Sequence, residues 1–547
     1  MVAQEFFTGE TIRLWEDSMR QRDAPPFDVS ADSLFVAYYA SAEFLCHLAL
    51  GWPLPHHVVD LFAEFRTLTN GLTLTSGAGL LGALTHCGLD AMSTVEKDSL
   101  RELALRGGRY DAAERAALLD YCAADVDALR RLLARMCGEV DLDRALIRGD
   151  YMKALARMEH CGVPLDSAYL ARVRAEWSTL RTTLIDRIDA SYGVFDGETF
   201  KRELFERFLA GREIAWPRAT SGRLQLDEAT FRTIARTNPL IAPLHELRVS
   251  LAQLRLGELE VGRDGRNRTM LSAFRTRTGR NAPSTSRFIF GQATWIRSFI
   301  KPEPGRALAY VDYSQQEFAI AARLSGDRRM QEAYASGDPY LQFAKQAGAI
   351  PADATRNSHE AARDRFKCGA LGALFGMGPR TLGQRIAQPL PYARDLLRAH
   401  HETYPDYWRW SDAVVDHALL LGRLHTTFGW TINIGPGVSP ASLRNWPVQS
   451  NGAEILRFAC CLVTEAGIRV CAPVHDALLI EAPVDDIEDH ARRASELMTE
   501  AGRIVLDGFP LRTDATVIRY PERYTDKRGA RMWTEVRSLV PSEDGHP

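Results

Sequence analysis

Two short apolar runs near the C-terminus, 470–474 and 478–480, flank a His-Asp-Ala tripeptide whose aspartate is Asp476. Their length and spacing predict two strands joined by a tight hairpin, with Asp476 at its tip. A third apolar run, 308–311, leads into Asp312 and then into a helical pattern. The sequence thus predicts an aspartate at the end of a strand twice. Taken singly, an Asp at such a place is most often a turn former or a helix cap.

Composition bounds the class of protein. The 547 residues suffice for three or four units of about 150 residues each. Hydrophobic residues make up 46% and charged residues 25%, which excludes a disordered, collagen-like or coiled-coil chain. A net charge of −3 excludes a chain-wide basic coat on a polymer but still allows a local basic groove. The nine cysteines form no CxxC pair, which favours a reduced, intracellular protein over a disulfide framework or a zinc site.

The N-terminal part of the sequence shows neither a signal peptide nor a membrane anchor. Its first residues include acids and lack the basic-then-apolar order of a secretory signal. The most apolar stretch, Leu34–Pro55, is interrupted by Glu43 and His47, so we expect a buried helix there and no membrane span. These features predict a soluble, cytoplasmic protein without membrane contact.

The segment 272–301 concentrates basic residues and contains no Asp or Glu. Its cations, which small polar residues separate, are Arg275, Arg277, Arg280, Arg287, Arg297 and Lys301. Such a segment is either a solvated basic loop or a stretch of backbone close to phosphates, which arginine and hydroxyl donors position. Composition alone leaves both interpretations open.

Between the two aspartates, one predicted helical stripe carries two cations. Arg363, Lys367, Leu371 and Phe375 follow one another at intervals of four, which keeps them along one face of a helix. The commoner explanation is an amphipathic surface helix with a snorkelling lysine. The same stripe also suits a phosphate clamp with an aromatic ring for base stacking.

In this order and spacing, the motifs resemble those of the family A DNA polymerases, the relatives of bacterial DNA polymerase I. The three that carry the resemblance are Asp312-Tyr313-Ser314-Gln315 with Glu317, Arg363-x3-Lys367-x7-Phe375-Gly376, and Val474-His475-Asp476. Further matches are Met158-Glu159-x2-Gly162-Val163-Pro164-Leu165-Asp166, Thr278-Gly279-Arg280, and Asn445-x-Pro447-x-Gln449. The resemblance covers the chain from about residue 140 to the end, and the chain looks like a short, bacteriophage-type member.

The resemblance implies a multidomain α/β fold. Residues 1–138 would form an RNase H-like α/β domain of the 3′–5′ exonuclease type, and residues 139–547 a right-hand polymerase domain. The expected parts of the latter are a helical thumb over about 145–265, an antiparallel-sheet palm over about 266–345 and 437–547, and helical fingers over about 346–436.

The resemblance also implies a template-directed DNA polymerase that adds deoxynucleotides to a primer 3′-hydroxyl in DNA replication. Two hard cations serve such an in-line attack on an α-phosphate, and their preferred ligands are carboxylates and substrate phosphates. Mg²⁺ is the expected ion, with Mn²⁺ as a substitute. Asp312 and Asp476 would bridge two ions, with the Tyr313 carbonyl as a further ligand. The expected partners are primer–template DNA, dNTPs and replication accessory factors; the chain would be a monomer in the cytoplasm, the host's if a phage encodes it.

The remaining motif residues take their roles from the family. Arg363 and Lys367 would neutralise the triphosphate, and Lys367 would also protonate the leaving group. Glu317 would lie under the sugar and exclude a 2′-hydroxyl. The other expected nucleotide contacts are Gln315, Leu371 and Phe375. The residues expected to hold primer and template are Arg275, Arg280, Asn445, Gln449 and His475.

The sequence departs from the family pattern at three places. Ala477 stands where the family has a Glu after His-Asp, so a third carboxylate is missing. Leu371 replaces a Phe or Tyr. The segment 287–292 matches the family poorly.

The N-terminal region keeps only part of an exonuclease pattern. Tyr121-x3-Asp125 matches the third exonuclease motif, whereas Tyr39-x3-Glu43 stands where the second motif has Asn-x3-Asp. The first motif, an Asp-x-Glu on an early strand, has no counterpart before residue 40, and we expect the chain to begin just after it. Two-metal proofreading needs these carboxylates, so we expect a structural remnant. No 5′-nuclease domain fits in the remaining length.

Two other functions compete with the DNA polymerase. A single-subunit RNA polymerase has the same arrangement of Asp, Lys and His-Asp motifs. The exclusion of a 2′-hydroxyl that we expect from Glu317 argues against this function. A non-catalytic, DNA-binding replication accessory protein would keep the fold, but intact Asp312, Lys367 and Asp476 argue against that. Primer extension with dNTP or NTP pools separates the three.

Overall fold

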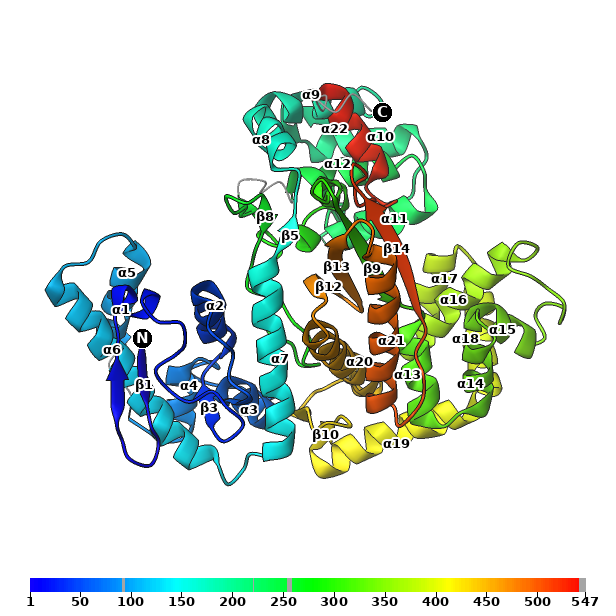
Figure 1. The fold of residues 1–547 in the computed structure, drawn as a ribbon. Coiled ribbons are helices and arrows are strands. Elements are labelled where there is room, and N and C mark those ends of the chain that lie inside the picture. Colours follow the sequence, from blue (N-terminus) through cyan, green and yellow to red (C-terminus); the bar gives the residue numbers. More distant parts are fainter. Residues whose placement is uncertain (91–93, 220, 253–257, 541–547) are drawn as a thin grey trace.

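The computed structural model describes residues 1–90, 94–219, 221–252 and 258–540. The end of the expected palm segment, residues 541–547, therefore lies outside the described part. Most of the described chain is helical, and its largest sheet has four strands (Figure 1). No described helix is long and apolar enough to cross a membrane.

The four-stranded sheet is antiparallel, in the order β12-β13-β9-β14. Its strands are β9 (Arg306–Tyr313), β12 (Arg469–Val474), β13 (Ala477–Pro483) and β14 (Thr513–Arg519). The three strands predicted from apolar runs are confirmed, as is the hairpin with Asp476 at its tip. Helices α20 (Pro440–Glu465) and α21 (Ile487–Val505) pack against each other and against the sheet.

A group of helices follows β9, and most of them lie to the right of the sheet in Figure 1. Its members are α13 (Gln316–Ser325), α14 (Arg328–Ala335), α15 (Pro339–Gln346), α16 (Glu360–Leu374), α17 (Pro379–Ile386), α18 (Leu390–Thr403) and α19 (Pro405–Leu421). The predicted stripe at intervals of four is confirmed as a helix, α16, up to Leu371, whereas Phe375 is its C-cap. A two-stranded hairpin, β10 (Arg423–His425) and β11 (Thr431–Asn433), then leads into α20.

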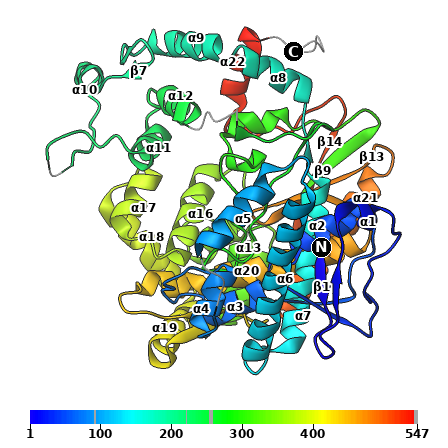
Figure 2. The ribbon, with the colours of Figure 1, turned by 90° about the vertical axis from the view of Figure 1, so that its left-hand side faces the viewer.

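A second helical group stands at the top of both ribbon views (Figures 1 and 2). It comprises α8 (Ser167–Ala175), α9 (Trp177–Asp189), α10 (Arg202–Gly211), α11 (Glu228–Thr237), α12 (Ala242–Ala252) and the small strands β6 (Phe195–Asp196) and β7 (Thr199–Phe200). Part of this group has an apolar core of its own, centred on Phe205 and Phe231. The last described helix, α22 (Ala530–Leu539), packs against α9 and the 3₁₀ helix η3 (Thr294–Phe299).

The N-terminal region mixes short strands with helices. Its elements are β1 (Val2–Gln4), β2 (Thr11–Arg13), α1 (Glu16–Arg20), β3 (Leu34–Ala37), α2 (Ser41–Leu50), β4 (His57–Asp60), α3 (Leu61–Thr69), α4 (Leu80–His86), α5 (Thr94–Arg106) and α6 (Ala112–Met136). The expectation of one helix over 34–55 is wrong, because 34–37 form a strand that pairs in parallel with β4. Tyr39, with φ of +74°, separates this strand from α2, since a left-handed residue cannot continue either element.

Helix α7 (Leu142–Cys161) joins the N-terminal region to the rest. It packs against α2 and β4 on one side and against α20 and β12 on the other. Arg148 on α7 makes a buried bidentate ion pair with Glu64 on α3, at 2.6 and 2.7 Å. The Asn70 amide after α3 donates to the carbonyl oxygens of Arg277 and Thr431, each at 2.8 Å. The N-terminal region is thus fastened to the remainder by buried polar contacts.

Candidate active site

Sheet register brings the two predicted aspartates to the same edge. In the pairing of β13 with β9, Ala477 lies opposite Asp312, so Asp476 in the preceding turn lies beside it. The Tyr313 N–H donates to the Asp476 carbonyl oxygen at 3.2 Å and ties the turn to the end of β9. His475, the first turn residue, has φ of +59°, a conformation that a non-glycine residue rarely adopts and that occurs often at functional sites.

A third carboxylate that the sequence did not reveal lies on the opposite side of Asp312. In the pairing of β14 with β9, Asp514 faces Asp312 directly, and paired residues of an antiparallel sheet point to the same face. Asp514 is exposed, and its carboxylate accepts a hydrogen bond from the Ser314 hydroxyl. Nothing in the local sequence marks Asp514, because only the strand register places it.

The electrostatics of this edge suit a cation. Burial, followed by the charges of Asp476 and Asp514, raises the pKa of the Asp312 carboxyl to about 7. The Asp312 Oδ1 atom is buried and has no hydrogen-bond partner among the described residues. A hard divalent ion relieves both conditions, since it neutralises adjacent carboxylates and coordinates their oxygens. The residues present therefore fit divalent metal ions.

Beside the aspartates, Glu317 is held in place by a neighbour on α20. The Gln449 amide donates to Glu317 Oε1 at 2.6 Å. Burial raises the pKa of Glu317, and the hydrogen bond from Gln449 and the charge of Arg280 oppose that rise. Burial lowers the pKa of the Arg280 guanidinium, and the charges of Glu317 and Asp476 oppose that fall. The structure thus brings together the predicted residues Glu317, Gln449, Arg280 and Asp476.

The loop that carries Arg280 is anchored by tryptophans. The Arg277 carbonyl accepts hydrogen bonds from the indole N–H groups of Trp430 (3.2 Å) and Trp446 (3.0 Å). Gly279 has φ of +76°, and a Cβ there would lie 3.0 Å from the Trp430 ring, so glycine is required. Arg457 also donates to the Gly279 carbonyl at 2.8 Å. Sequence reasoning missed these anchors, because a buried Trp or Arg inside a helix or hairpin carries no local signal of such a role.

The two cations of α16 have different environments. Lys367 is exposed and has no ion pair among the described residues; its Nζ lies 5.7 Å from the Tyr340 ring centre. Arg363 is buried and pairs with Asp338 at 2.8 Å and with Asp364 at 3.0 Å. Of the two cations in the predicted stripe, Lys367 is therefore available to a ligand, whereas Arg363 is already ion-paired.

Two of the other predicted nucleotide contacts follow Lys367 along α16, and the third precedes α13. Leu371 is half-buried one turn further along α16, and Phe375 at its C-cap is 42% exposed. Gln315 has φ of +52° just before α13, and its Oε1 accepts from Arg512 Nη2 at 3.2 Å. Arg512 was not predicted; its position beside the active-site edge again comes from the pairing of β14.

The remaining predicted DNA contacts are placed as follows. His475 is exposed at the hairpin tip, and Arg275 is exposed in the loop before Arg280. Asn445 lies one turn before Gln449 on α20, and its Oδ1 is buried without a hydrogen-bond partner among the described residues. Of the other cations in the basic segment, Arg297 is buried and pairs with Asp526 at 3.0 Å.

The exonuclease-motif residues predicted in the N-terminal region lie on two helices. Glu43 lies on α2, Tyr121 and Asp125 lie on α6, and the charges of Glu43 and Asp125 both affect the pKa of Cys122.

Asp60, which was not predicted, is fully buried at the end of β4. Its carboxylate accepts from the Ala40 N–H at 2.6 Å and the Ala63 N–H at 3.0 Å, so it caps α3.

The sequence of this chain is similar to those of known DNA polymerases. The model of DNA polymerase family A matches residues 218–519. Thermostable DNA polymerase I of Thermus aquaticus is 27% identical over 433 residues, which cover 72% of this chain and 50% of that protein. A DNA polymerase of Mycobacterium phage L5 is 29% identical over 218 residues, 39% of this chain and 34% of that protein. The chain spans about half the length of the first of these.

One solved structure has a similar fold. It is the POL domain of Pol1 from M. smegmatis in complex with DNA primer-template and dNTP. The match has a TM-score of 0.65 at 20% sequence identity and covers 91% of this chain and 86% of that one. The likeness shows a common fold of mixed α and β elements.

Proposed function

The chain belongs to DNA polymerase family A, and we propose that it is a template-directed DNA polymerase, which extends a primer 3′-hydroxyl with deoxynucleotides. The observation that carries this proposal is the strand register that sets Asp476 beside Asp312. The structural relative was solved with DNA primer-template and dNTP, which supports the same partners here. In this proposal the four-stranded sheet belongs to the palm, α16–α19 belong to the fingers, and α8–α12 belong to the thumb.

The carboxylates at the sheet edge would hold two Mg²⁺ ions. Asp312 and Asp476 are the proposed bridging pair, with the Tyr313 carbonyl as a further ligand. Asp514 is a third carboxylate, supplied by β14 in place of the Glu that is missing at Ala477. When bound, the ions would stabilise the attacking and leaving oxygens of the phosphoryl transfer.

Residues of α13 and α16 would receive the incoming nucleotide. Lys367, exposed and free of ion pairs among the described residues, would bind the triphosphate and hold at Nζ a proton for the leaving pyrophosphate. Arg363 would first have to exchange Asp338 or Asp364 for a phosphate, so we assign it mainly to holding α16. Phe375 would stack near the nascent base pair, with Leu371 and Gln315 around the nucleotide.

Glu317 would select the sugar. Its carboxylate is fixed by Gln449, so it cannot swing aside to admit a 2′-hydroxyl without breaking a 2.6 Å hydrogen bond. Arg280, His475 and Asn445 surround the same edge and would hold the primer terminus and template, with Arg275 further along the backbone. Replication of DNA, by a phage-type enzyme with accessory factors, is the proposed setting.

Primer extension on a defined template tests the proposal. The protein should extend the primer with dNTPs in Mg²⁺ and, more weakly, in Mn²⁺, and should use NTPs poorly. Preferential use of NTPs would indicate an RNA polymerase instead. DNA binding without extension would indicate an accessory protein.

A further inference from the structure

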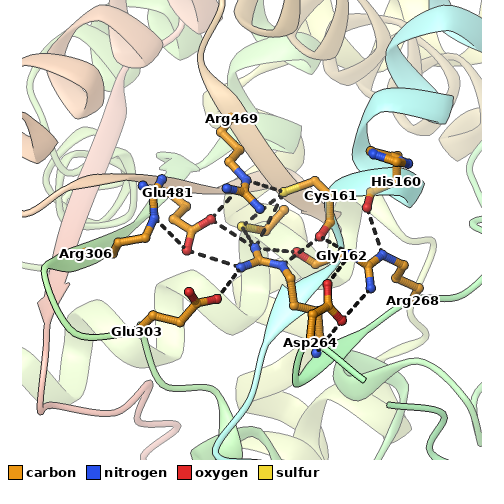
Figure 3. A network of polar contacts seen from close by, with 11 residues as sticks. His160, Cys161, Gly162, Asp264, Arg268, Glu303, Arg306, Arg469 and Glu481 are labelled. Carbon is orange, nitrogen blue, oxygen red and sulfur yellow. Dashed lines mark hydrogen bonds and ion pairs between the residues drawn. The ribbon is translucent and has the colours of Figure 1, made fainter. Parts of the chain in front are cut away.

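A buried polar network lies at the other end of the β12–β13 hairpin from Asp476 (Figure 3). At its centre the Glu481 carboxylate, fully buried on β13, contacts three guanidinium groups. Arg266 lies at 3.0 Å, Arg306 at 3.1 Å and Arg469 at 3.1 Å from its oxygens. Two cysteines complete the network: Cys161, the last residue of α7, and Cys471 on β12.

The charges of this network do not balance without a thiolate. Its cations are Arg266, Arg268, Arg306 and Arg469, and its anions are Asp264, Glu303 and Glu481. Four guanidinium groups against three carboxylates leave one positive charge over. Solvent screens part of that excess, because the side chains of Arg469 and Glu303 are about half exposed, but it does not reach Arg266, which is only 2% exposed.

The sulfur atoms are placed to take up this charge. Arg469 Nε donates to Cys161 Sγ at 3.2 Å, and Arg266 Nη2 lies 3.6 Å from both sulfurs. The contact with Cys471, together with the charges of Arg266 and Arg469, lowers the pKa of the Cys161 thiol to about 6 against the effect of burial. Burial raises the pKa of the Cys471 thiol well above its usual range. Of the two thiols, Cys161 therefore has the lower pKa and ionises the more readily.

A metal ion is the competing explanation for this cluster. The ligand atoms of Cys161, Cys471 and Glu481 all lie within 4.8 Å of one another, as in a zinc site. However, the guanidinium groups already donate to both sulfurs and to the carboxylate. A divalent cation here would add positive charge to a network that already has an excess of it. The arrangement favours an anionic sulfur over a metal.

We propose that Cys161 and Cys471 are a redox pair that forms a reversible disulfide when the protein meets a peroxide. The two sulfur atoms are 3.9 Å apart and must approach each other by about 2 Å to form a bond of about 2 Å. The Cys161 thiolate would attack hydrogen peroxide, giving a sulfenic acid and hydroxide. The Cys471 thiol would then displace water from that sulfur to form the disulfide, with its proton leaving in the water. Two electrons pass from the sulfurs to the peroxide.

Peptide mapping of the full chain tests the pair directly. After hydrogen peroxide, alkylation and trypsin without reductant, we expect the peptides 158–172 and 470–492 to be linked. Their joint mass should be two hydrogens below the sum, and dithiothreitol should separate them. The buried pair Cys460 and Cys461, on the peptide 458–469, is the internal control and should stay unlinked. Oxidation of the protein in guanidinium chloride should abolish this selectivity.

Two single-residue variants test which cysteine attacks the peroxide and which then forms the disulfide with it. Cys471→Ser should stop the reaction at a Cys161 sulfenic acid, which dimedone traps, whereas Cys161→Ser should give neither trapped acid nor link. Absence of the linked peptide from the oxidised, folded wild-type chain overturns the proposal, whatever the variants do. So does one zinc ion per purified chain that Cys471→Ser loses, because the cluster would then be a metal site. Neither outcome bears on primer extension.

Discussion

Asp60 and Asp312 each stand where a strand gives way to a helix, in two different regions of the chain. The Asp60 oxygens accept backbone N–H groups of Ala40 and Ala63, so this carboxylate is used up in holding α2 and α3. Asp312 Oδ1 has no such partner among the described residues, and two further carboxylates stand next to it. The same local pattern thus gives a helix cap in one region and a candidate catalytic group in the other.

A structural acid and a functional acid therefore differ in whether their carboxylate oxygens remain available to bind a ligand. Burial raises the pKa of both groups, to about 6 for Asp60 and about 7 for Asp312. After burial, the largest effects on the pKa of Asp60 are backbone hydrogen bonds, which oppose the rise. At Asp312 the largest is the charge of Asp476, which adds to the rise. Carboxylates that repel one another in this way are common at functional sites.

The largest expected effect is at the polymerase site. Asp312→Asn and Asp476→Asn should each reduce the rate of primer extension by about 10³-fold or more, because each removes a proposed metal-bridging charge. Single-turnover extension in Mg²⁺ measures this loss. Asp485→Asn, an exposed aspartate just beyond the other end of β13, is the matched control and should retain the wild-type rate. Near wild-type extension by either site variant would show that the metal assignment is wrong.

Glu317→Ala should raise the ratio of ribonucleotide to deoxynucleotide incorporation by about 10- to 100-fold, because the side chain would no longer fill the space of a 2′-hydroxyl. Matched NTP and dNTP incorporation kinetics on one template measure the ratio. Gln449→Ala keeps the carboxylate but removes the 2.6 Å hydrogen bond that fixes it, so it should give a smaller rise. An unchanged ratio in Glu317→Ala would refute the gate.

Asp514→Ala should weaken Mn²⁺ binding about 10-fold, with a similar loss in extension, if β14 supplies the third carboxylate. Titration of Mn²⁺ followed by electron paramagnetic resonance reads binding without catalysis. Thr516→Ala, two residues along the same face of β14, is the control. Equal Mn²⁺ affinity in Asp514→Ala and wild type would confine the site to Asp312 and Asp476.

Asp60 should make the N-terminal region less stable as pH rises. Its pKa is raised in the folded protein, so the folded state binds the proton more tightly than the unfolded state. The stability it contributes is therefore present below pH 4 and is lost between about pH 4 and 6, by about 3 kcal/mol. Hydrogen exchange of the Ala40 and Ala63 amides, followed across this pH range, measures the loss of stability. Asp60→Asn should flatten this dependence, and a persisting slope would exclude Asp60 as its source.

The smallest expected effect is in the N-terminal region, where proofreading should be absent or weak. The protein, given Mg²⁺ and a mismatched primer without nucleotides, should leave the primer intact, because the given sequence has no Asp-x-Glu before residue 40 and has Glu43 where we expect an Asp. Asp125→Asn should change nothing. Rapid shortening of the primer that Asp125→Asn abolishes and Asp312→Asn preserves would show that the N-terminal region is an active exonuclease.

Sequence reasoning predicted the elements whose signal is local. The hairpin around Asp476 and the strand before Asp312 appear as predicted. It failed at 34–55, where one apolar stretch contains a strand and a helix. Hydrophobicity alone does not show where the period changes, and the left-handed Tyr39 carries no sequence signal.

The sequence by itself determined the family, the aspartates of the two strand ends and the helical stripe that carries Lys367. Those features depend on short motifs and on periodicity, both of which are local. Only the tertiary structure decided that Arg363 is paired, that Asp514 faces Asp312 and that Cys161 meets Cys471. Each of these contacts joins elements distant in sequence or on different helices and strands. Their partners are set by strand register and by packing of one element on another, which no local pattern encodes.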